Sequence, residues 1–194
     1  MPNCVDVVLL AQYNETMNRR LYDAATKLSP EELRSDRKAF FGSLLGTMNH
    51  LIVGDTIWLS RFALHPSRFR ALDSLRGLPV PTSLTQSYGD SLPQLQAHRT
   101  RLDKIITALA EELRPSDLDQ VLTYQNSRGL RFQKRFGSLL LHLFNHQTHH
   151  RGQASTLLTQ ADVDIGVTDL LELIHEVEAP GGSSIEAVCH AAEG

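Results

Sequence analysis

Apolar residues recur every three or four positions along four long segments of the chain, a spacing typical of amphipathic helices. The first segment carries a single apolar stripe made of Leu10, Tyr13, Met17, Leu21 and Ala24. It ends near Lys27, after which Ser29 and Pro30 predict the cap and the first residue of a short helical turn. The second segment begins after Ser43, a candidate N-cap, and is stopped by Pro66.

Residues 66–90 show no helical period. Pro79 and Pro81 within "GLPVPTS" exclude a regular helix there, because each removes a donor and restricts the residue before it. This stretch is long enough to cross one end of a helical bundle. The third helix is predicted from about Ser91 to Leu113. The stretch "LDQVLTYQNSRGLRFQKRF" then predicts a short β-hairpin, since its apolar residues favour strands and "NSRG" holds turn residues.

The fourth helix opens at "FGSLLLHLFNH" and runs to about Gln160. A short fifth helix is expected from Asp169 to Val177, with Thr168 as its cap. The stretch "APGGSS" then breaks the chain. We therefore expect one all-α domain over residues 1–178, with the hairpin before the fourth helix, and a C-terminal tail over residues 179–194.

The composition narrows the class of protein. The chain has 194 residues, of which 41% are hydrophobic, and this suffices for one domain with a core. A formal net charge of -3 disfavours a DNA-associated factor or any other nucleic-acid-binding protein. The apolar runs fall far short of the ~20 residues of a membrane span, and the first residues lack the features of a signal peptide. Cys4 and Cys189 are too far apart in sequence for a disulfide framework or a thiolate metal site, so we expect a reducing, cytoplasmic compartment. Together with the charge and the short apolar runs, this predicts a cytoplasmic protein that binds neither nucleic acid nor membrane.

Four of the nine histidines lie in "LLLHLFNHQTHHRGQ", residues 139–153. Residues four apart on a helix differ by about 40° in direction, so His142, His146 and His150 form one row, with Gln153 close to it. His149 is turned about 60° the other way from His146. Two histidines four residues apart are a natural pair of ligands for a divalent metal.

A pair of this kind alone is a weak signal, because a catalytic metal usually has three protein ligands. Gln147 stands where the helical zinc motif of metalloproteases has a Glu as general base, which excludes that class of enzyme. His50, in "TMNHLIVGD", is the best third ligand, since a solvated histidine is out of place in so apolar a helix. The alternative for His50 is a buried neutral histidine bonded to a backbone carbonyl. His142 is either a fourth ligand, a core residue or a residue that supports the ligands without binding the metal.

A short internal echo links the two helices that carry these histidines. "FGSLL" occurs at residues 41–45 and again at 136–140, and each copy leads into Asn-His, at Asn49–His50 and at Asn145–His146. The simpler interpretation is that both copies are helix starts with a Ser cap followed by leucines. The functional interpretation is that each helix carries a histidine about two turns in, where the helices bring them together.

Few other residues are candidates for chemistry. His65 precedes Pro66 at a helix end, where a cation suits the helix dipole. Three histidines without a partner pattern are expected on the surface: His98, His175 and His190. The chain has no GxSxG elbow and no Gly-rich phosphate loop. Asp55 either orients a ligand or forms hydrogen bonds within the protein.

Three blocks of the sequence resemble the DinB family of damage-inducible metalloenzymes: "YNETMNRRLYDAATKLS", "FFGSLLGTMNHLIVGDTIWLSRF" and "GSLLLHLFNHQTHHRGQ". The resemblance extends from about Ala11 to Leu173, and the histidine pattern agrees throughout. It implies a four-helix bundle with a long crossover. It also implies a metal triad with one histidine from the second helix and two from the fourth, which here are His50, His146 and His150. The implied ion is a divalent transition metal, nickel or zinc, and the implied assembly is a homodimer.

Members of this family include enzymes that use low-molecular-weight thiols. We therefore expect a metal-dependent thiol-S-transferase or hydrolase with a small-molecule substrate, in which the metal lowers the pKa of a bound thiol or water. Asn49, Asn145 and Gln153 are expected either to orient the ligands or to form ordinary interhelical hydrogen bonds. Gly152 is expected to permit close helix approach, and Arg151 to face a carboxylate. The alternative function is that of a non-catalytic metal-binding protein of the stress response.

Overall fold

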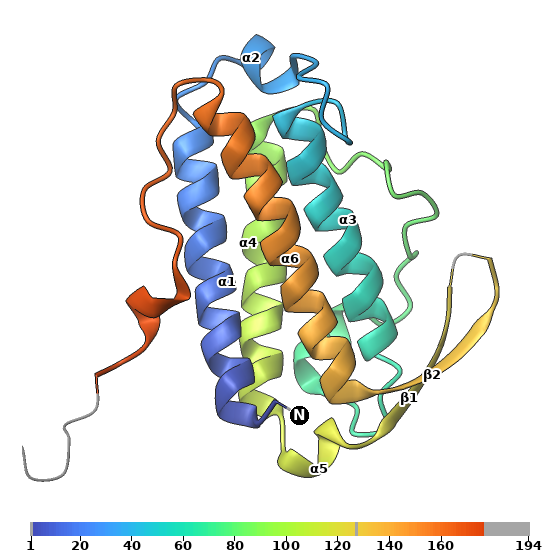
Figure 1. Ribbon diagram of the computed structural model, residues 1–194. Helices are drawn as coiled ribbons and strands as arrows, with labels where there is room; N and C mark the ends of the chain where they lie inside the picture. Colours follow the sequence, from blue (N-terminus) through green and yellow to red (C-terminus); the bar gives the residue numbers. More distant parts are fainter. Residues whose placement is uncertain (1, 127, 177–194) are drawn as a thin grey trace, which may run out of the picture.

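Four long helices dominate the computed structural model, which describes residues 2–126 and 128–176. They are α1 (Cys4–Ala25), α3 (Leu44–Phe62), α4 (Leu92–Glu112) and α6 (Phe136–Thr159). The helices lie side by side, with α1 in contact with α4 and α6, and α3 in contact with the same two helices (Figure 1). Their apolar stripes form one continuous buried core. Within the described ranges, no helix is both long enough and apolar enough to cross a membrane.

Two of the three predicted serine caps are present, and the third is not. Ser29 caps the short helix α2 (Pro30–Arg34), and the Ser43 hydroxyl accepts a hydrogen bond of 3.0 Å from the Gly46 amide at the start of α3. The second "FGSLL" differs, because α6 begins at Phe136 and Ser138 already lies inside the helix. The predicted Ser cap of this copy is wrong, since the preceding strand leads directly into the helix and leaves no separate capping residue.

The connections differ in kind. Between α3 and α4 the chain forms a 3-10 helix, η1 (Arg70–Leu75), and then an irregular crossover as far as Ser91. Between α4 and α6 it forms one turn of helix, α5 (Pro115–Leu118), and then the predicted antiparallel hairpin. The hairpin consists of β1 (Val121–Gln125) and β2 (Arg131–Arg135). It projects from the lower end of the four helices beside α3 (Figure 1).

The C-terminal segment corrects one prediction. Instead of a fifth α-helix from Asp169 to Val177, the chain forms only a 3-10 turn, η2 (Leu170–Leu173), with Asp169 as its cap. Thr168 does not cap it, and its carbonyl instead accepts a hydrogen bond of 2.7 Å from the Tyr13 hydroxyl of α1. A segment without a buried face gains too little from packing to form a longer helix. The rest of this prediction, with the tail over residues 179–194, Cys189 and His190, lies outside the described residues.

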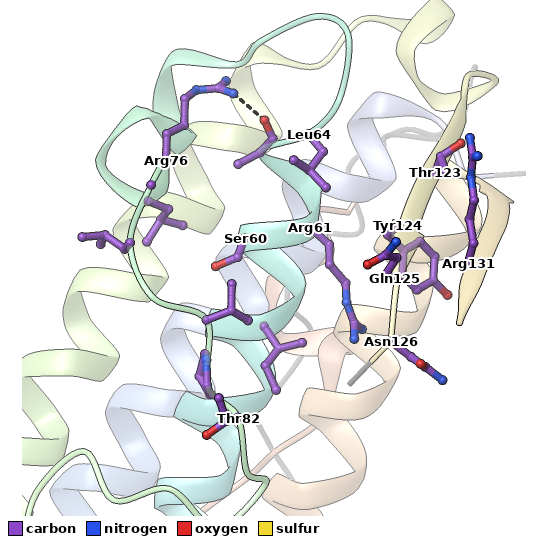
Figure 2. A pocket seen from close by; sticks show the side chains of 17 residues that line it. Ser60, Arg61, Leu64, Arg76, Thr82, Thr123, Tyr124, Gln125, Asn126 and Arg131 are labelled. Carbon is purple, nitrogen blue, oxygen red and sulfur yellow. Dashed lines mark hydrogen bonds between the residues drawn. The ribbon is translucent and has the colours of Figure 1, made fainter. Parts of the chain in front are cut away.

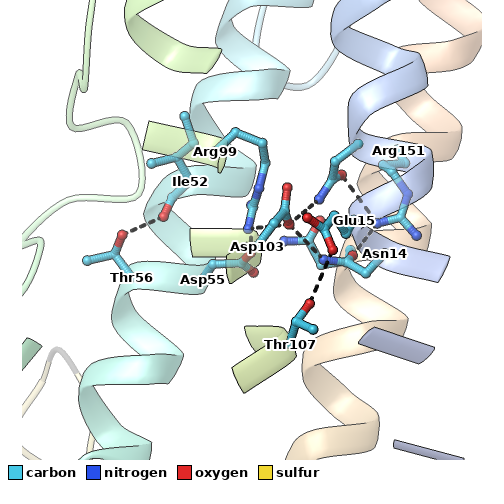
Figure 3. Close-up of polar contacts among 11 residues, drawn as sticks. Asn14, Glu15, Ile52, Asp55, Thr56, Arg99, Asp103, Thr107 and Arg151 are labelled. Carbon is cyan, nitrogen blue, oxygen red and sulfur yellow. Dashed lines mark hydrogen bonds and ion pairs between the residues drawn. The ribbon is translucent and has the colours of Figure 1, made fainter. Parts of the chain in front are cut away.

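Charged side chains lie at the centre of the four helices. Asp55 of α3 accepts a hydrogen bond of 2.6 Å from Arg99 of α4, and both side chains are almost fully buried. The same guanidinium lies 3.0 Å from the carboxylate of Asp103, one turn further along α4. Asn14 and Asn18 of α1 donate to Asp103 at 3.2 and 2.8 Å (Figure 3). These contacts tie α1, α3 and α4 together.

A second arginine, Arg151, connects α6 to these buried polar groups. The Arg151 guanidinium donates to the side-chain oxygen of Asn14 and, at 3.3 Å, to that of Gln147. The Gln147 amide in turn donates to the carboxylate of Asp55. We call the complete set the polar ring: Asn14, Asn18, Asp55, Arg99, Asp103, Gln147 and Arg151. It holds two positive and two negative charges, and it joins all four long helices.

The charges of the polar ring depend on one another because water does not reach them. Burial raises the pKa of Asp103, and the Arg99 guanidinium and the Asn18 amide oppose this rise. Burial alone would lower the pKa of Arg99, but the carboxylates of Asp103 and Asp55 outweigh that effect and raise it. Arg99 therefore stays charged and balances both carboxylates.

We predict that Arg99→Met lowers the free energy of unfolding by about 3–5 kcal/mol, because it leaves two buried carboxylates without their cation. Urea denaturation followed by circular dichroism measures this. Arg19→Met removes the same charge from an exposed site on α1 and should change stability by less than about 0.5 kcal/mol. Equal stabilities of the two variants would contradict the role given to Arg99.

Candidate metal centre

The contact between α3 and α6 brings the three predicted histidines together. One ring nitrogen of each of His50, His146 and His150 lies within 4.8 Å of the others. The ring centroids are 5.3 Å apart for His50 and His146, 4.5 Å for His50 and His150, and 4.4 Å for His146 and His150. Within residues 2–126 and 128–176, no other set of three histidine, cysteine or acidic side chains is arranged to hold a metal.

The polar ring sets the direction in which the histidines of α6 point. Gln147 and Arg151 directly follow His146 and His150, and successive helical residues differ by about 100° in direction. Because Gln147 and Arg151 are bonded inside the four helices, α6 cannot rotate about its axis. His146 and His150 are thereby held toward α3, on the side that carries His50.

Gly54 provides the space that His146 occupies. A β-carbon at position 54 would lie 2.6 Å from Cε1 and 3.3 Å from Nδ1 of the His146 ring. Any side chain there would push the imidazole away from its two partners. The next residue, Asp55, belongs to the polar ring, so α3 repeats the arrangement of α6, in which a site residue precedes a ring residue. Sequence reasoning missed Gly54, although it lies one helical turn after His50.

Hydrogen bonds orient two of the three imidazoles. Nδ1 of His50 lies 3.3 Å from the carbonyl oxygen of Leu84, and Nδ1 of His150 lies 2.7 Å from the side-chain oxygen of Gln153. Each oxygen accepts a hydrogen bond from the Nδ1–H group of a neutral ring, and in that tautomer Nε2 is unprotonated and able to bind a metal. The two alternatives predicted for His50, a metal ligand and a buried neutral histidine bonded to a backbone carbonyl, are therefore compatible. His50 lies in the three-histidine cluster and its Nδ1 also bonds to the carbonyl of Leu84. Gln153 is in contact with a candidate ligand, as one alternative expected.

Asn49 forms hydrogen bonds with the backbone of the crossover and not with a histidine ring. Its amide donates to the carbonyl of Gln86 at 2.7 Å, and its oxygen accepts from the amide of Tyr88 at 2.8 Å. These bonds fix the loop that carries Leu84, the partner of His50. Asn145 is exposed, and within the described part of the chain its side chain makes no hydrogen bond.

All three histidines are held neutral near pH 7. Burial, and then the His150 and His50 rings, lower the pKa of His146 to about 3. Burial is also the main cause of the lowered pKa of His50 and of His150, although the bonds to Leu84 and Gln153 oppose it. Neutral imidazole is the form that binds a metal, so no proton has to leave before binding.

Aromatic rings close one side of the site. The Phe41 ring stacks on His50 with centroids 3.9 Å apart, and it meets His150 edge-on at 5.5 Å. The histidines line a pocket of about 350 Å³, with Trp58 and His142 further along its wall. The protein thus leaves an opening beside the histidines while it covers one face of His50.

His142 and His149 lie outside the cluster. The His142 ring packs edge-on against Trp58 at 4.8 Å and lies 6.2 Å from His146, so it lines the pocket without joining the three. His149 is exposed, as its different direction on α6 predicted, and it contacts Gln153 at 3.3 Å.

The structure corrects three further predictions. His65 is not an exposed cation: it is 1% exposed, its Nδ1 accepts from the Ser67 amide, and burial lowers its pKa. Gly152 is not at a close contact between helices, because a β-carbon there would have open space around it. Arg151 bonds to neutral amide oxygens and a hydroxyl, and within the described residues it forms no ion pair with a carboxylate. Asp55 forms hydrogen bonds within the helices, as one alternative held.

The surface predictions have mixed outcomes. His175 is exposed as expected, whereas His98 is half-buried and packs edge-on against Tyr88 at 5.1 Å.

The donor set fits a divalent transition metal. Nickel and zinc both accept imidazole ligands. One nitrogen of each ring lies within 4.8 Å of the others, close enough for the three imidazoles to share one ion. Nδ1 of His146 is buried and has no hydrogen-bond partner in the described structure. Buried polar atoms are normally bonded, so an unpaired ring nitrogen here fits a site that holds a further group, such as a metal ion.

Comparison with known proteins gives a consistent result. The sequence matches the DinB family over residues 1–180. It is 23% identical over 161 residues to Protein DinB of Bacillus subtilis (strain 168), an alignment that covers 82% of this chain and 88% of that protein. No solved structure matches the chain.

We predict that Gly54→Ala weakens zinc binding at least about tenfold, because the new methyl group displaces the His146 ring. Isothermal titration calorimetry measures the affinity. Gly152→Ala is the matched control, since it makes the same substitution in open space on α6 and should leave the affinity unchanged. Equal affinities of both variants and the unaltered protein would show that Gly54 does not set the position of His146.

Proposed function

The chain belongs to the DinB family, and from this premise we propose that His50, His146 and His150 bind one nickel or zinc ion in a thiol-S-transferase or hydrolase. One observation carries the proposal: three neutral imidazoles from two helices converge beside a pocket that has room for a small molecule. Three protein ligands with space for a fourth are typical of catalytic zinc sites, whereas structural sites are closed by four.

The bound ion would supply a Lewis acid that lowers the pKa of a thiol or water in the open position. The protein's own residues have separate tasks. His50 and His150 are oriented by Leu84 and Gln153, and Phe41 keeps bulk water away from one face of His50. His142 lines the same pocket and packs against Trp58, and its imidazole would accept the proton of the thiol or water.

The pocket supports an enzyme over a non-catalytic metal-binding protein. A site that only stores or senses a metal needs no cavity for a second molecule, and here the cavity lies directly beside the histidines. We assign the arrangement of the four long helices to the four-helix bundle with a long crossover that the family resemblance implies. The pairwise contacts of α1 and α3 with α4 and α6 support this assignment. The homodimer, the cytoplasmic location and the low-molecular-weight thiol remain predictions.

We predict that His50→Ala, His146→Ala and His150→Ala each lose most of the bound metal, because each removes one of three ligands. Elemental analysis of the purified, dialysed variants measures metal per chain. Activity in thiol-transfer and hydrolysis screens should fall with the metal content.

His149→Ala is the matched control for these variants. It removes an exposed imidazole from the same helix, one residue before His150, and should keep a full metal equivalent. A full equivalent in His50→Ala would eliminate the three-histidine site, and loss of metal in His149→Ala would show that the ligands are misassigned.

A further inference from the structure

A second, larger cavity adjoins the metal-binding pocket. It encloses about 950 Å³ between α3, the crossover after η1 and the β-hairpin (Figure 2). The two spaces are adjacent, because they share four lining residues, Ile57, Arg61, Pro81 and Thr82. Arg61 lines both spaces, so its side chain lies where the larger cavity meets the metal-binding pocket.

The larger cavity is positively charged although the protein is negatively charged overall. Three arginines line it, Arg61, Arg76 and Arg131, and among the described residues its lining contains no aspartate or glutamate. The whole chain, by contrast, has a formal net charge of -3. Arg76 is already engaged, because it pairs with Asp73 at 2.9 Å and donates to the carbonyl of Ala63. A cavity of this kind favours an anion.

Arg61 is the guanidinium that remains free at the junction. It lies over the faces of Trp58 and Tyr124, with its central carbon 4.6 and 5.0 Å from the two ring centroids. Within residues 2–126 and 128–176 its guanidinium has no hydrogen bond and no ion pair, so the N–H groups are available to a ligand. The aromatic rings hold the guanidinium in place without using those donors. Figure 2 shows the side chain extending from α3 toward the hairpin residues Tyr124 and Gln125.

We propose that this cavity binds the carboxylate of a small organic acid, with Arg61 as the anion-binding residue. The planar edge of a guanidinium matches a carboxylate through two parallel hydrogen bonds. A phosphate dianion fits less well, since such groups are usually held by several donors or a helix N-terminus. Arg131 also has no ion pair within the described residues, but it is exposed on the hairpin and does not line the metal-binding pocket, so Arg61 is the guanidinium at the junction. The walls beside it include Ile57, Leu78 and Val80, which suit a hydrocarbon body.

The same geometry relates the two ends of such a ligand. Gly54, beside His146, and Arg61 are seven residues apart on α3, a rise of about 10 Å. An acid with a reactive group at its far end would place its carboxylate at Arg61 and that group at the histidines. The position of the reactive group at the histidines rests on the proposed metal function, whereas the carboxylate site at Arg61 does not.

Trp58 provides a local reporter, because it is the only tryptophan of the chain and it touches Arg61. The experiment titrates the metal-free protein with hexanoate and with hexanol and records Trp58 fluorescence. Hexanoate should bind at least about tenfold more tightly than hexanol, and Arg61→Met should remove that preference. Arg61→Lys should restore part of it. Arg19→Met, the same change on an exposed face of α1, should keep it in full.

Equal responses to hexanoate and hexanol, no response to hexanoate, or unchanged hexanoate affinity in Arg61→Met would each overturn the proposal. Circular dichroism spectra of all variants establish that each is folded. His50→Ala should bind hexanoate like the unaltered protein, so loss of the metal site leaves this test intact. In the zinc-loaded protein, 6-mercaptohexanoate should bind more tightly than hexanoate. Equal affinities there would count against the proposed metal function, while the Arg61 dependence of hexanoate would still decide the carboxylate site.

Discussion

Two arginines and two aspartates lie among the helices of this protein where water does not screen them, and they can stay there only if every charge keeps its partner. The polar ring meets this requirement by taking members from all four long helices. A rotation or shift of any one helix would leave a buried charge uncompensated, which costs several kcal/mol. Apolar packing tolerates small displacements more easily than this, so the ring defines how the helices face one another.

The candidate metal centre follows from that constraint. On α3 and α6 the site residues Gly54, His146 and His150 each stand directly before a member of the polar ring. The bonds that hold the ring residues inside therefore hold the site residues at the neighbouring angle, toward the pocket. The site needs this support because two half-buried imidazoles and a buried one gain little from one another until a metal binds. A rigid scaffold keeps the rings oriented in advance, so less binding free energy is spent on ordering them.

Much of this arrangement could be predicted from local patterns. The 3.6-residue period located the long helices, and the row of histidines on α6 together with the apolar setting of His50 supplied the candidate ligands. The family resemblance selected His50, His146 and His150 from among them, and these are the three that meet. The sequence could not show what depends on distant partners. Gln147 stood out only as a missing general base, yet it bonds to Asp55, 92 residues earlier. The roles of Gly54 and Arg61 depend on residues distant in sequence, because Gly54 faces the His146 ring and Arg61 lies over the ring of Tyr124. His65 and Gly152 were misjudged for the same reason, since their neighbours come from the tertiary structure.

X-ray absorption spectroscopy of the zinc-loaded protein tests the central claim most directly, because it counts and identifies the atoms bound to the ion. The account predicts three imidazole nitrogens at about 2.0–2.1 Å and a fourth light atom from solvent or substrate. The same spectrum with one or two imidazoles, or with a sulfur ligand at about 2.3 Å in the protein free of added thiol, would contradict it.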